Sequence, residues 1–250
     1  PKWFLKDAKL KALPRQAEDN WQEVNEACVM FLQMNAFWTK DYFFGLFEKL
    51  VRTVNDAEEV LDIETEYPSV TVAKFPDALY DAKYKLLEDP SADVNGPLMH
   101  MLKGPIKELG SATRKVEMIH AQPERHPEKP DSRYLNDMTR FTLSAADPMV
   151  LGIVYAAIND MSGVDIMFTN NKYLGSLKDV EKTGSPSVLS NLQVKPPGLP
   201  PFISEVRLYL DNFLSLKKSQ HKTYEITRAN KFFDMLKPIF KVNFENVRAI

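Results

Sequence analysis

The chain has little cysteine and no long apolar run. Cys28 is the only cysteine among 250 residues, so no internal disulfide can form. It lies beside Phe31 and Leu32 on an apolar helical face, which favours a small core residue over a nucleophile. No stretch reaches the roughly 18 apolar residues of a membrane span. A formal net charge of -2 gives no overall attraction to nucleic acid or anionic membrane, so any phosphate-binding surface must be a local cluster.

Several catalytic motifs are also missing. The sequence has no Walker A motif, no Gly-rich dinucleotide loop, no His-Glu-x-x-His, no paired CxxC and no nucleophile elbow. His120 and His126 border a proline-rich loop, where a metal site is one interpretation. No cysteine or carboxylate stands at matching ligand spacing, so solvated loop histidines are favoured. No signal peptide opens the chain. The first residue is proline and not methionine, from which we expect the sequence to be a fragment of a longer protein.

The apolar pattern predicts a largely helical first hundred residues. Apolar residues make up 44% of the chain and charged residues 26%, as in ordinary globular proteins. From Trp21 to Val54 the apolar positions follow helical spacing and predict two long helices with a break near Asn35. The aromatic residues within 37–44 suit either a partner-binding surface or the core, and their spacing favours the core.

Later segments alternate between helix and strand patterns. We expect short helices over 76–87 and 98–102, helices over 107–119 and 148–160, strands over 134–143, 164–169 and from Ser204, a loop-rich stretch over 175–201, and closing helices over 212–228 and 230–237. This order predicts an α+β fold, with a mixed β-sheet flanked by helices and a helical N-terminal extension. We expect residues 1–96 to form a helical region packed on a core of residues 97–250.

Two acids are candidate metal ligands. Asp137 is expected within the strand predicted over 134–143, three residues before Arg140, where an acid at a strand edge paired with a base is the plain interpretation. The functional interpretation puts Mg²⁺ at Asp137, because hard cations prefer carboxylate oxygens and take only one or two from the protein when a nucleotide supplies the rest. Glu205, which opens the amphipathic segment 205–210, would be the second ligand.

Basic residues accompany these acids along the sequence. Lys107, Ser111 and either Arg114 or Lys115 recur at helical spacing, where a solvated charged face is the plain interpretation and phosphate binding the functional one. Lys172 follows the second predicted strand. His221 and its neighbours lie on a helix after Glu205, where His221 is either a surface residue or a group that orients phosphate.

The order of these residues resembles the RelA/SpoT family of alarmone synthetases, and divergent toxin members in particular. The matching positions are Lys107, Ser111 and Lys115 for a Lys-x-x-x-Ser-x-x-x-Lys segment, Asp137 and Arg140 for an acidic strand, Lys172 for a basic loop, Glu205 and Val206 for a Glu-Val-Gln strand, and His221, Tyr224 and Glu225 for the following helix. The resemblance covers residues 104–228.

The resemblance implies a nucleotide pyrophosphokinase, an Mg²⁺-dependent transferase that moves pyrophosphate from ATP to the ribose 3′-hydroxyl of an acceptor nucleotide. Asp137 and Glu205 would hold Mg²⁺, and Glu205 would also take the hydroxyl proton. Lys107, Lys115 and Lys172 would hold ATP phosphates. The remaining site residues are those expected beside the adenine, the phosphates or the catalytic acid: Ser111, Arg114, Arg140, His221 and Tyr224.

Two departures from the family pattern concern the acceptor. Guanine-using members carry a Gly-Tyr pair whose ring stacks on the acceptor base, whereas this chain has Gly184-Ser185. Arg207 stands where the family has Gln. The pattern therefore favours adenosine acceptors (AMP, ADP or ATP), giving (p)ppApp, over GDP or GTP, as in toxin effectors that act in the cytoplasm of a target cell after secretion and have an immunity or regulatory partner.

Two alternatives stay open at this level. The same fold could be a catalytically degenerate module that binds a nucleotide or a protein, because Ser185 and Arg207 replace substrate-reading residues. Transfer to the 3′ end of tRNA is a further variant, and the near-neutral charge argues mildly against nucleic acid. No membrane partner is expected.

Overall fold

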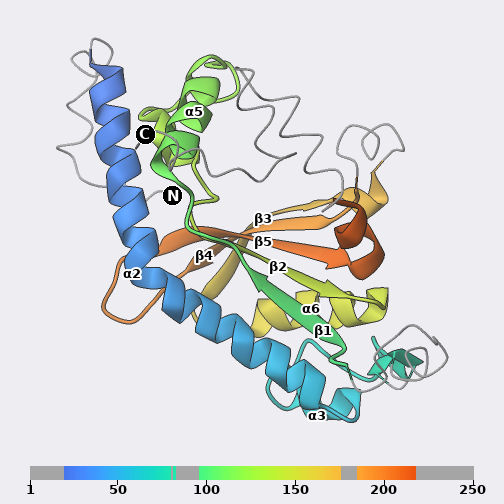
Figure 1. Cartoon of the computed structure of the whole chain (residues 1–250). Helices are drawn as coiled ribbons and strands as arrows, with labels where there is room; N and C mark the ends of the chain where they lie inside the picture. Colours follow the sequence, from blue (N-terminus) through green and yellow to red (C-terminus); the bar gives the residue numbers. More distant parts are fainter. Residues whose placement is uncertain (1–19, 80, 83–95, 176–184, 218–250) are drawn as a thin grey trace, which may run out of the picture.

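The computed structural model describes residues 20–79, 81–82, 96–175 and 185–217 (Figure 1). They form an α+β fold around one five-stranded mixed sheet, as the sequence predicted. The strands are β1 (Met99–Lys103), β2 (Arg140–Ala145), β3 (Val164–Asn171), β4 (Val188–Val194) and β5 (Phe202–Leu210). Their order across the sheet is β1-β2-β5-β4-β3. Only β2 and β5 run parallel to each other, and every other neighbouring pair is antiparallel.

Two strands differ from the sequence prediction. The helix predicted over 98–102 is wrong, because these residues form most of β1 and pair with β2. Strand β4 lies within the stretch predicted to be loop. Its Ser190, Leu192 and Val194 alternate with half-buried residues, which is the period of a strand with one buried face. The prolines of this stretch flank the strand and do not interrupt it, so β4 keeps its backbone donors.

The first helix, α2 (Trp21–Asp56), is continuous over 36 residues, so the predicted break near Asn35 is wrong. No proline occurs within it to remove a backbone donor. Asn35 lies on the buried side, with 5% of its surface exposed, and its carbonyl accepts a hydrogen bond from the Thr39 hydroxyl at 2.7 Å. The buried amide side chain therefore belongs to the packed face and does not mark a helix end.

The larger core lies between one face of the sheet, α2 and α6 (Pro148–Asp160). Phe43 and Phe47 of α2 are fully buried, and their ring centroids lie 5.0 and 4.5 Å from that of Phe141 in β2. Helix α6 matches the predicted range; the Asp147 carboxylate accepts the Met149 N–H and proline stands in the first turn. A short helix, α3 (Val60–Glu64), follows α2.

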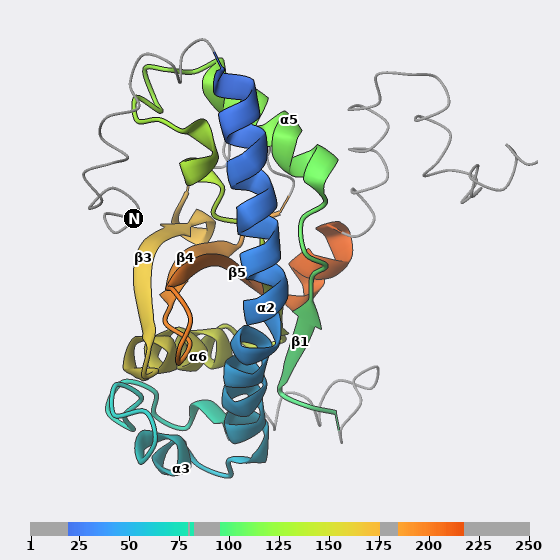
Figure 2. The same cartoon turned by 90° about the vertical axis from the view of Figure 1, so that its left-hand side faces the viewer.

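A second, smaller core joins the N-terminal half of α2 to α5 (Leu109–His120) and the 3₁₀ turn η3 (Asp131–Tyr134). Figures 1 and 2 show α5 beside this half of α2, away from α6. The helix predicted over 107–119 is confirmed, although it begins at Leu109. The strand predicted over 134–143 begins only at Arg140. The strand predicted over 164–169 is confirmed as β3, which is followed by a 3₁₀ turn, η4 (Lys172–Leu174).

The remaining predicted helices are only partly covered by the described residues. Residues 78–79, 81–82 and 211–217 are helical, in agreement with the predictions there. Residues 76–77 form a turn, so the predicted helix begins two residues late. Residues 80, 83–87 and 218–228, and all of 230–237, lie outside the described residues. The division of the chain at residues 96 and 97 stays a prediction.

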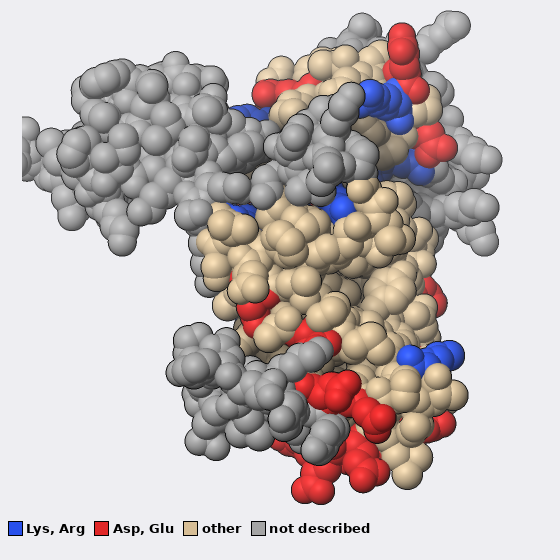
Figure 3. All heavy atoms as spheres, turned by 90° about the vertical axis from the view of Figure 1, so that its right-hand side faces the viewer, with Lys and Arg blue, Asp and Glu red and all other residues tan. Residues whose placement is uncertain are grey.

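The aromatic cluster of α2 is divided between core and surface. Phe43 and Phe44 are buried, but 59% of the surface of both Phe37 and Trp38 is exposed, so the core interpretation is wrong for these two residues. Within the described residues, no helix combines the length and apolar character needed to cross a membrane. On the face shown in Figure 3, acidic side chains gather at the end of the molecule that holds α3, whereas basic ones lie mainly toward the α5 end.

Candidate active site

The side chains of β5 alternate between the core and the opposite face of the sheet. Val206 and Leu208 are buried in the core with α2 and α6. Glu205, Arg207 and Tyr209 therefore point to the other face, because successive side chains in a strand alternate. Glu205 has 7% of its surface exposed and stands beside Arg140 of β2. A buried carboxylate is thus fixed at the start of the parallel β2–β5 pair.

A second buried carboxylate, Asp137, lies just before β2 and not within a strand as predicted. Its Oδ2 is 2.8 Å from the Nζ of Lys107, and its Oδ1 is 2.8 Å from the Nζ of Lys115. The side chains of Asp137 and Lys107 are 10% and 8% exposed, whereas that of Lys115 is 37% exposed. Burial raises the pKa of the Asp137 carboxyl, but Lys115 and Lys107 together hold this pKa below its ordinary value.

The chain before α5 brings the two lysines to this acid. The Gly104 N–H donates to the Arg140 carbonyl at 3.0 Å, and the Lys107 N–H donates to the Met138 carbonyl at 2.9 Å. Residues 104–107 therefore extend the backbone pairing of β1 past the start of β2. Helix α5 then starts at Leu109, so Lys107 precedes the helix and does not share its face as predicted. Lys115 reaches Asp137 from within α5.

Backbone pairing places the two acids at the same end of the β2–β5 pair. The Glu205 N–H donates to the Thr139 carbonyl at 3.0 Å, two residues after Asp137. The Glu205 Oε1 accepts a hydrogen bond from Arg207 Nε at 2.7 Å. Burial lowers the pKa of the Arg207 guanidinium, but the adjacent carboxylate outweighs it and the pKa is raised. Asp137 and Glu205 are therefore both engaged by cations.

The site-facing side of β5 continues past Arg207. Tyr209 is buried, and the Nζ of Lys217 lies 4.5 Å from its ring centroid. Burial raises the pKa of the Tyr209 hydroxyl, but hydrogen bonds from Lys217 and Ser187 outweigh this and lower the pKa. Sequence reasoning missed Arg207 as the partner of Glu205, and it missed Tyr209. The alternation of Glu205, Arg207 and Tyr209 in a strand pattern was the signal for both.

The other predicted site residues lie around this centre or outside it. Arg140 is half-buried at the start of β2, and on α5 Ser111 is half-buried and Arg114 exposed. Lys172 lies in η4, where its N–H donates to the Ser187 carbonyl. Ser187 precedes Val188, which pairs with Leu208, so Lys172 is level with position 209 and stands roughly 13 Å beyond Glu205 along the strand direction. His221, Tyr224 and Glu225 lie outside the described residues.

The two histidines of the proline-rich loop, His120 and His126, both pack against aromatic rings. The His120 ring stacks on Trp21 at a centroid distance of 3.9 Å, and its Nδ1 lies 3.0 Å from the Oδ2 of Asp131. It is therefore not a solvated loop residue. His126 packs on the ring of Tyr134, with centroids 4.6 Å apart. Among the described residues, no group of three or more His, Cys, Asp or Glu side chains is arranged to hold a metal ion.

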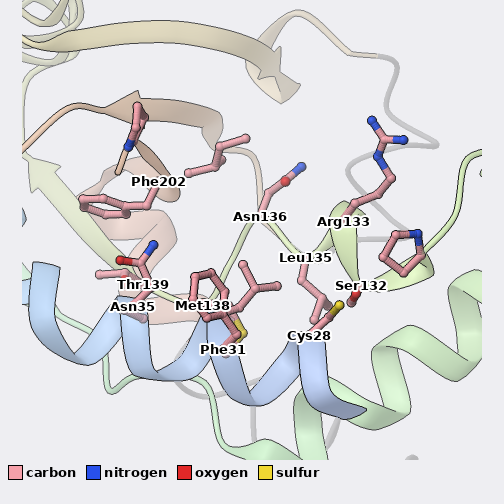
Figure 4. Close-up of a pocket in the computed structure, with 15 residues that line it drawn as sticks. Cys28, Phe31, Asn35, Ser132, Arg133, Leu135, Asn136, Met138, Thr139 and Phe202 are labelled. Atoms are coloured by element: carbon pink, nitrogen blue, oxygen red, sulfur yellow. The ribbon is translucent and has the colours of Figure 1, made fainter. Parts of the chain in front are cut away.

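A mainly apolar cavity lies apart from the candidate lysines and acids (Figure 4). It measures about 70 Å³ and lies between α2, the segment from η3 to β2 and the start of β5. Cys28 and Phe31 line it from α2, and Thr139 and Phe202 line it from the sheet side. None of the described lysine, aspartate and glutamate candidates lines it, so this cavity and the charged site are two different places.

Comparison with known proteins gives structural likeness only. No family model matches the chain, and no curated protein sequence matches it. The small alarmone synthetase 1 of Bacillus subtilis, bound to its product pppGpp, is 10% identical with a TM-score of 0.41, over 70% of this chain and 85% of that one. The small alarmone synthetase 2 of the same organism is 12% identical (TM-score 0.41; 67% and 85% covered). A GTP pyrophosphokinase family protein from Streptococcus pneumoniae is 10% identical (TM-score 0.40; 73% and 86%).

Proposed function

We propose that the chain is a nucleotide pyrophosphokinase, which transfers the β,γ-pyrophosphate of ATP to the ribose 3′-hydroxyl of an acceptor nucleotide. The observation that carries this proposal is the pair of buried acids, Asp137 and Glu205, at one end of the parallel β2–β5 pair with Lys107 and Lys115 on Asp137. Transfer of phosphate groups depends on positioning and charge neutralisation more than on covalent chemistry, and such a cluster can supply both.

The donor atoms suit Mg²⁺ that arrives with a nucleotide. Two carboxylates are hard oxygen donors, and Mg²⁺ usually takes one or two of these while phosphates and water complete its octahedron. In this proposal Asp137 and Glu205 hold the ion, which would neutralise negative charge on the phosphates. Lys107 and Lys115 would bind phosphate oxygens, Lys115 in exchange for Asp137, with Lys172 as a further phosphate-binding group.

The proposed reaction is a single displacement at the β-phosphorus of ATP. The acceptor 3′-oxygen forms a bond to the β-phosphorus while the bond from that phosphorus to the α,β-bridging oxygen breaks, so AMP leaves with the electron pair. Glu205 takes the proton of the attacking hydroxyl in this assignment. Ser111, Arg114 and Arg140 would contact the adenine or the phosphates. His221 and Tyr224, outside the described residues, would support the acid and the phosphate.

An adenosine nucleotide is the acceptor we favour, with (p)ppApp as the product. The reason is local: Ser185 takes the place of a stacking aromatic, and it is buried with 3% of its surface exposed. A toxin role, with action in the cytoplasm of a target cell and an immunity or regulatory protein as partner, is the biological setting of this proposal.

The second candidate function is a module that binds a nucleotide without turnover. The specific observation in its favour is that Arg207 occupies Glu205, the residue proposed to accept the proton. Tight nucleotide binding in calorimetry without any product would support this candidate.

One assay tests the proposed function. The protein is incubated with Mg²⁺ and ATP together with AMP, ADP, GDP or GTP, and the nucleotides are separated by anion exchange. We expect AMP release that depends on the acceptor and is greatest with an adenosine nucleotide. Glu205→Ala should abolish AMP release. Equal AMP release by the wild type and Glu205→Ala with every acceptor would contradict the proposal.

A further inference from the structure

Cations occupy the carboxylate oxygens that a metal ion would use. Lys107 and Lys115 each lie 2.8 Å from a different oxygen of Asp137, and Arg207 Nε lies 2.7 Å from Oε1 of Glu205. A metal at the short distance of a Mg–O bond, about 2.1 Å, would have to share an Asp137 oxygen with an ammonium group. The free protein therefore presents a site already neutralised by its own cations.

We infer that a divalent cation enters this site only together with a polyphosphate, and that Lys115 is the group that admits it. This inference rests on the proposed function and concerns the order in which its ligands bind. In the free protein Lys115 holds Oδ1 of Asp137. When a nucleotide arrives, Lys115 moves to a phosphate oxygen, and Oδ1 becomes available to the metal that the nucleotide carries.

The two lysines differ in a way that assigns the movement to Lys115. The Lys107 side chain is 8% exposed, and its own backbone is held by the hydrogen bond to Met138. The Lys115 side chain is 37% exposed and comes from the surface of α5. A lysine is a point charge on a flexible stem, so an exposed one can change partners without moving the backbone. Lys107 then stays on Oδ2 and keeps the carboxylate oriented.

Electrostatics gives the order of binding. A free divalent cation would approach Asp137 against two ammonium groups in a site that water screens weakly. A triphosphate instead offers both a negative field and new acceptors for Lys115, so one ion pair replaces another. By thermodynamic reciprocity, metal and nucleotide must raise each other's affinity by the same factor.

The test uses the full chain, Mn²⁺ and the ATP analogue AMPCPP. Electron paramagnetic resonance of free Mn²⁺ measures metal binding without nucleotide, and calorimetry measures AMPCPP binding with Mn²⁺ and with EDTA. We expect no Mn²⁺ binding below millimolar concentration in the absence of nucleotide. We expect AMPCPP to bind at least tenfold more tightly with Mn²⁺ than with EDTA.

Lys115→Met tests the role of the Lys115 ammonium group, because methionine keeps a side chain of similar length and removes the charge. We expect its affinity for free Mn²⁺ to rise at least tenfold, its affinity for AMPCPP to fall, and the coupling between the two ligands to shrink. Lys129→Met is the matched control: Lys129 is 41% exposed and pairs with another buried acid, Asp131. That control should behave as wild type in all three measurements. Lys115→Gln is a second variant if Lys115→Met lowers the folded fraction in circular dichroism.

The outcomes separate this inference from the function on which it rests. Free Mn²⁺ binding to the wild type as tightly as in the presence of AMPCPP would overturn the inference, as would unchanged free-metal affinity in both Lys115 variants. AMPCPP that binds equally well with Mn²⁺ and with EDTA would overturn the inference alone. AMPCPP that does not bind under any condition would contradict the proposed function itself.

Discussion

Replacing Arg207 by glutamine tests whether this residue restrains the candidate acid Glu205. Arg207 Nε donates to the Glu205 Oε1 at 2.7 Å from the position two residues along the same strand, so both side chains share one face of β5. Glutamine is the residue that the RelA/SpoT pattern has at this place. Its amide can still donate a hydrogen bond to the carboxylate, but it brings no charge. The substitution therefore removes the ion pair while it leaves a polar neighbour.

The geometry sets the size of the effect. Two unit charges 2.7 Å apart interact by about 6 kcal/mol at an effective dielectric constant of about 20. The Arg207 side chain is 32% exposed, so solvent screens much of this and the net value falls to about 1–2 kcal/mol. Release of that restraint corresponds to a gain of about tenfold in affinity for the metal–nucleotide complex. The free protein should lose a similar free energy of unfolding, which lowers the melting temperature by about 3–6 °C.

The assay combines calorimetry with Mn²⁺ and AMPCPP, thermal unfolding, and AMP release from ATP at subsaturating substrate. We expect Arg207→Gln to bind the complex more tightly, to release AMP faster and to melt earlier. Arg133→Gln is the matched control, because Arg133 also pairs with a glutamate, Glu128, but lies in η3 and not in the β2–β5 pair. It should leave nucleotide affinity unchanged.

Opposite changes in stability and affinity are what distinguish a restraint from a substrate contact. If Arg207→Gln instead bound the metal–nucleotide complex tenfold more weakly, Arg207 would be a phosphate ligand and our reasoning would fail. An unchanged melting temperature together with unchanged affinity would mean that the pair contributes nothing in solution.

Three further predictions concern the framework. Gly104→Ala should lower the free energy of unfolding by about 1–3 kcal/mol in urea, because its Cβ would lie 2.8 Å from a carbonyl oxygen of β2, whereas Gly110→Ala has open space and should be neutral or slightly stabilising. Phe47→Ala should cost about 3–5 kcal/mol in the same assay, and exposed Phe37→Ala less than about 0.5 kcal/mol. The pKa of Asp131 is lowered, since its hydrogen bonds and ion pairs with Lys129 and His120 outweigh burial, so its stabilisation is complete above the ordinary pKa and is lost as pH falls below it. Asp131→Asn should therefore flatten the decline of melting temperature between about pH 5 and 3.

Local sequence signals predicted some helices and strands correctly and failed for others. Helix α6 could be read because an aspartate cap and a proline begin it and its apolar residues continue to its end. Strand β4 was missed because the prolines on either side of it dominate the composition of that stretch. Strand β1 was taken for a helix because five apolar and basic residues fit either period, and only pairing with β2 decides between them.

The sequence singles out the residues of the candidate site, but most of their contacts could not be predicted. The sequence indicated Lys107, Lys115 and Asp137 as separate groups, and an acid thirty residues from a lysine has no local reason to contact it. That contact depends on residues 104–107 running beside β2 and the residues just before it. This is tertiary packing, which local sequence patterns do not indicate. The pairing of Glu205 with Arg207 is different, because it follows from strand alternation alone once β5 is recognised.

Arg207 is therefore the residue at which the two candidate functions diverge. As a departure from the RelA/SpoT pattern that the sequence resembles, it favours the proposed module without turnover. As a half-buried cation on a carboxylate, it is also a charge that a metal–nucleotide complex can displace, in the way we propose for Lys115 on Asp137. An enzyme should gain activity when this restraint is removed, because the acid is needed during turnover. A binding module should gain affinity without any AMP release, so the same variant decides between the two functions.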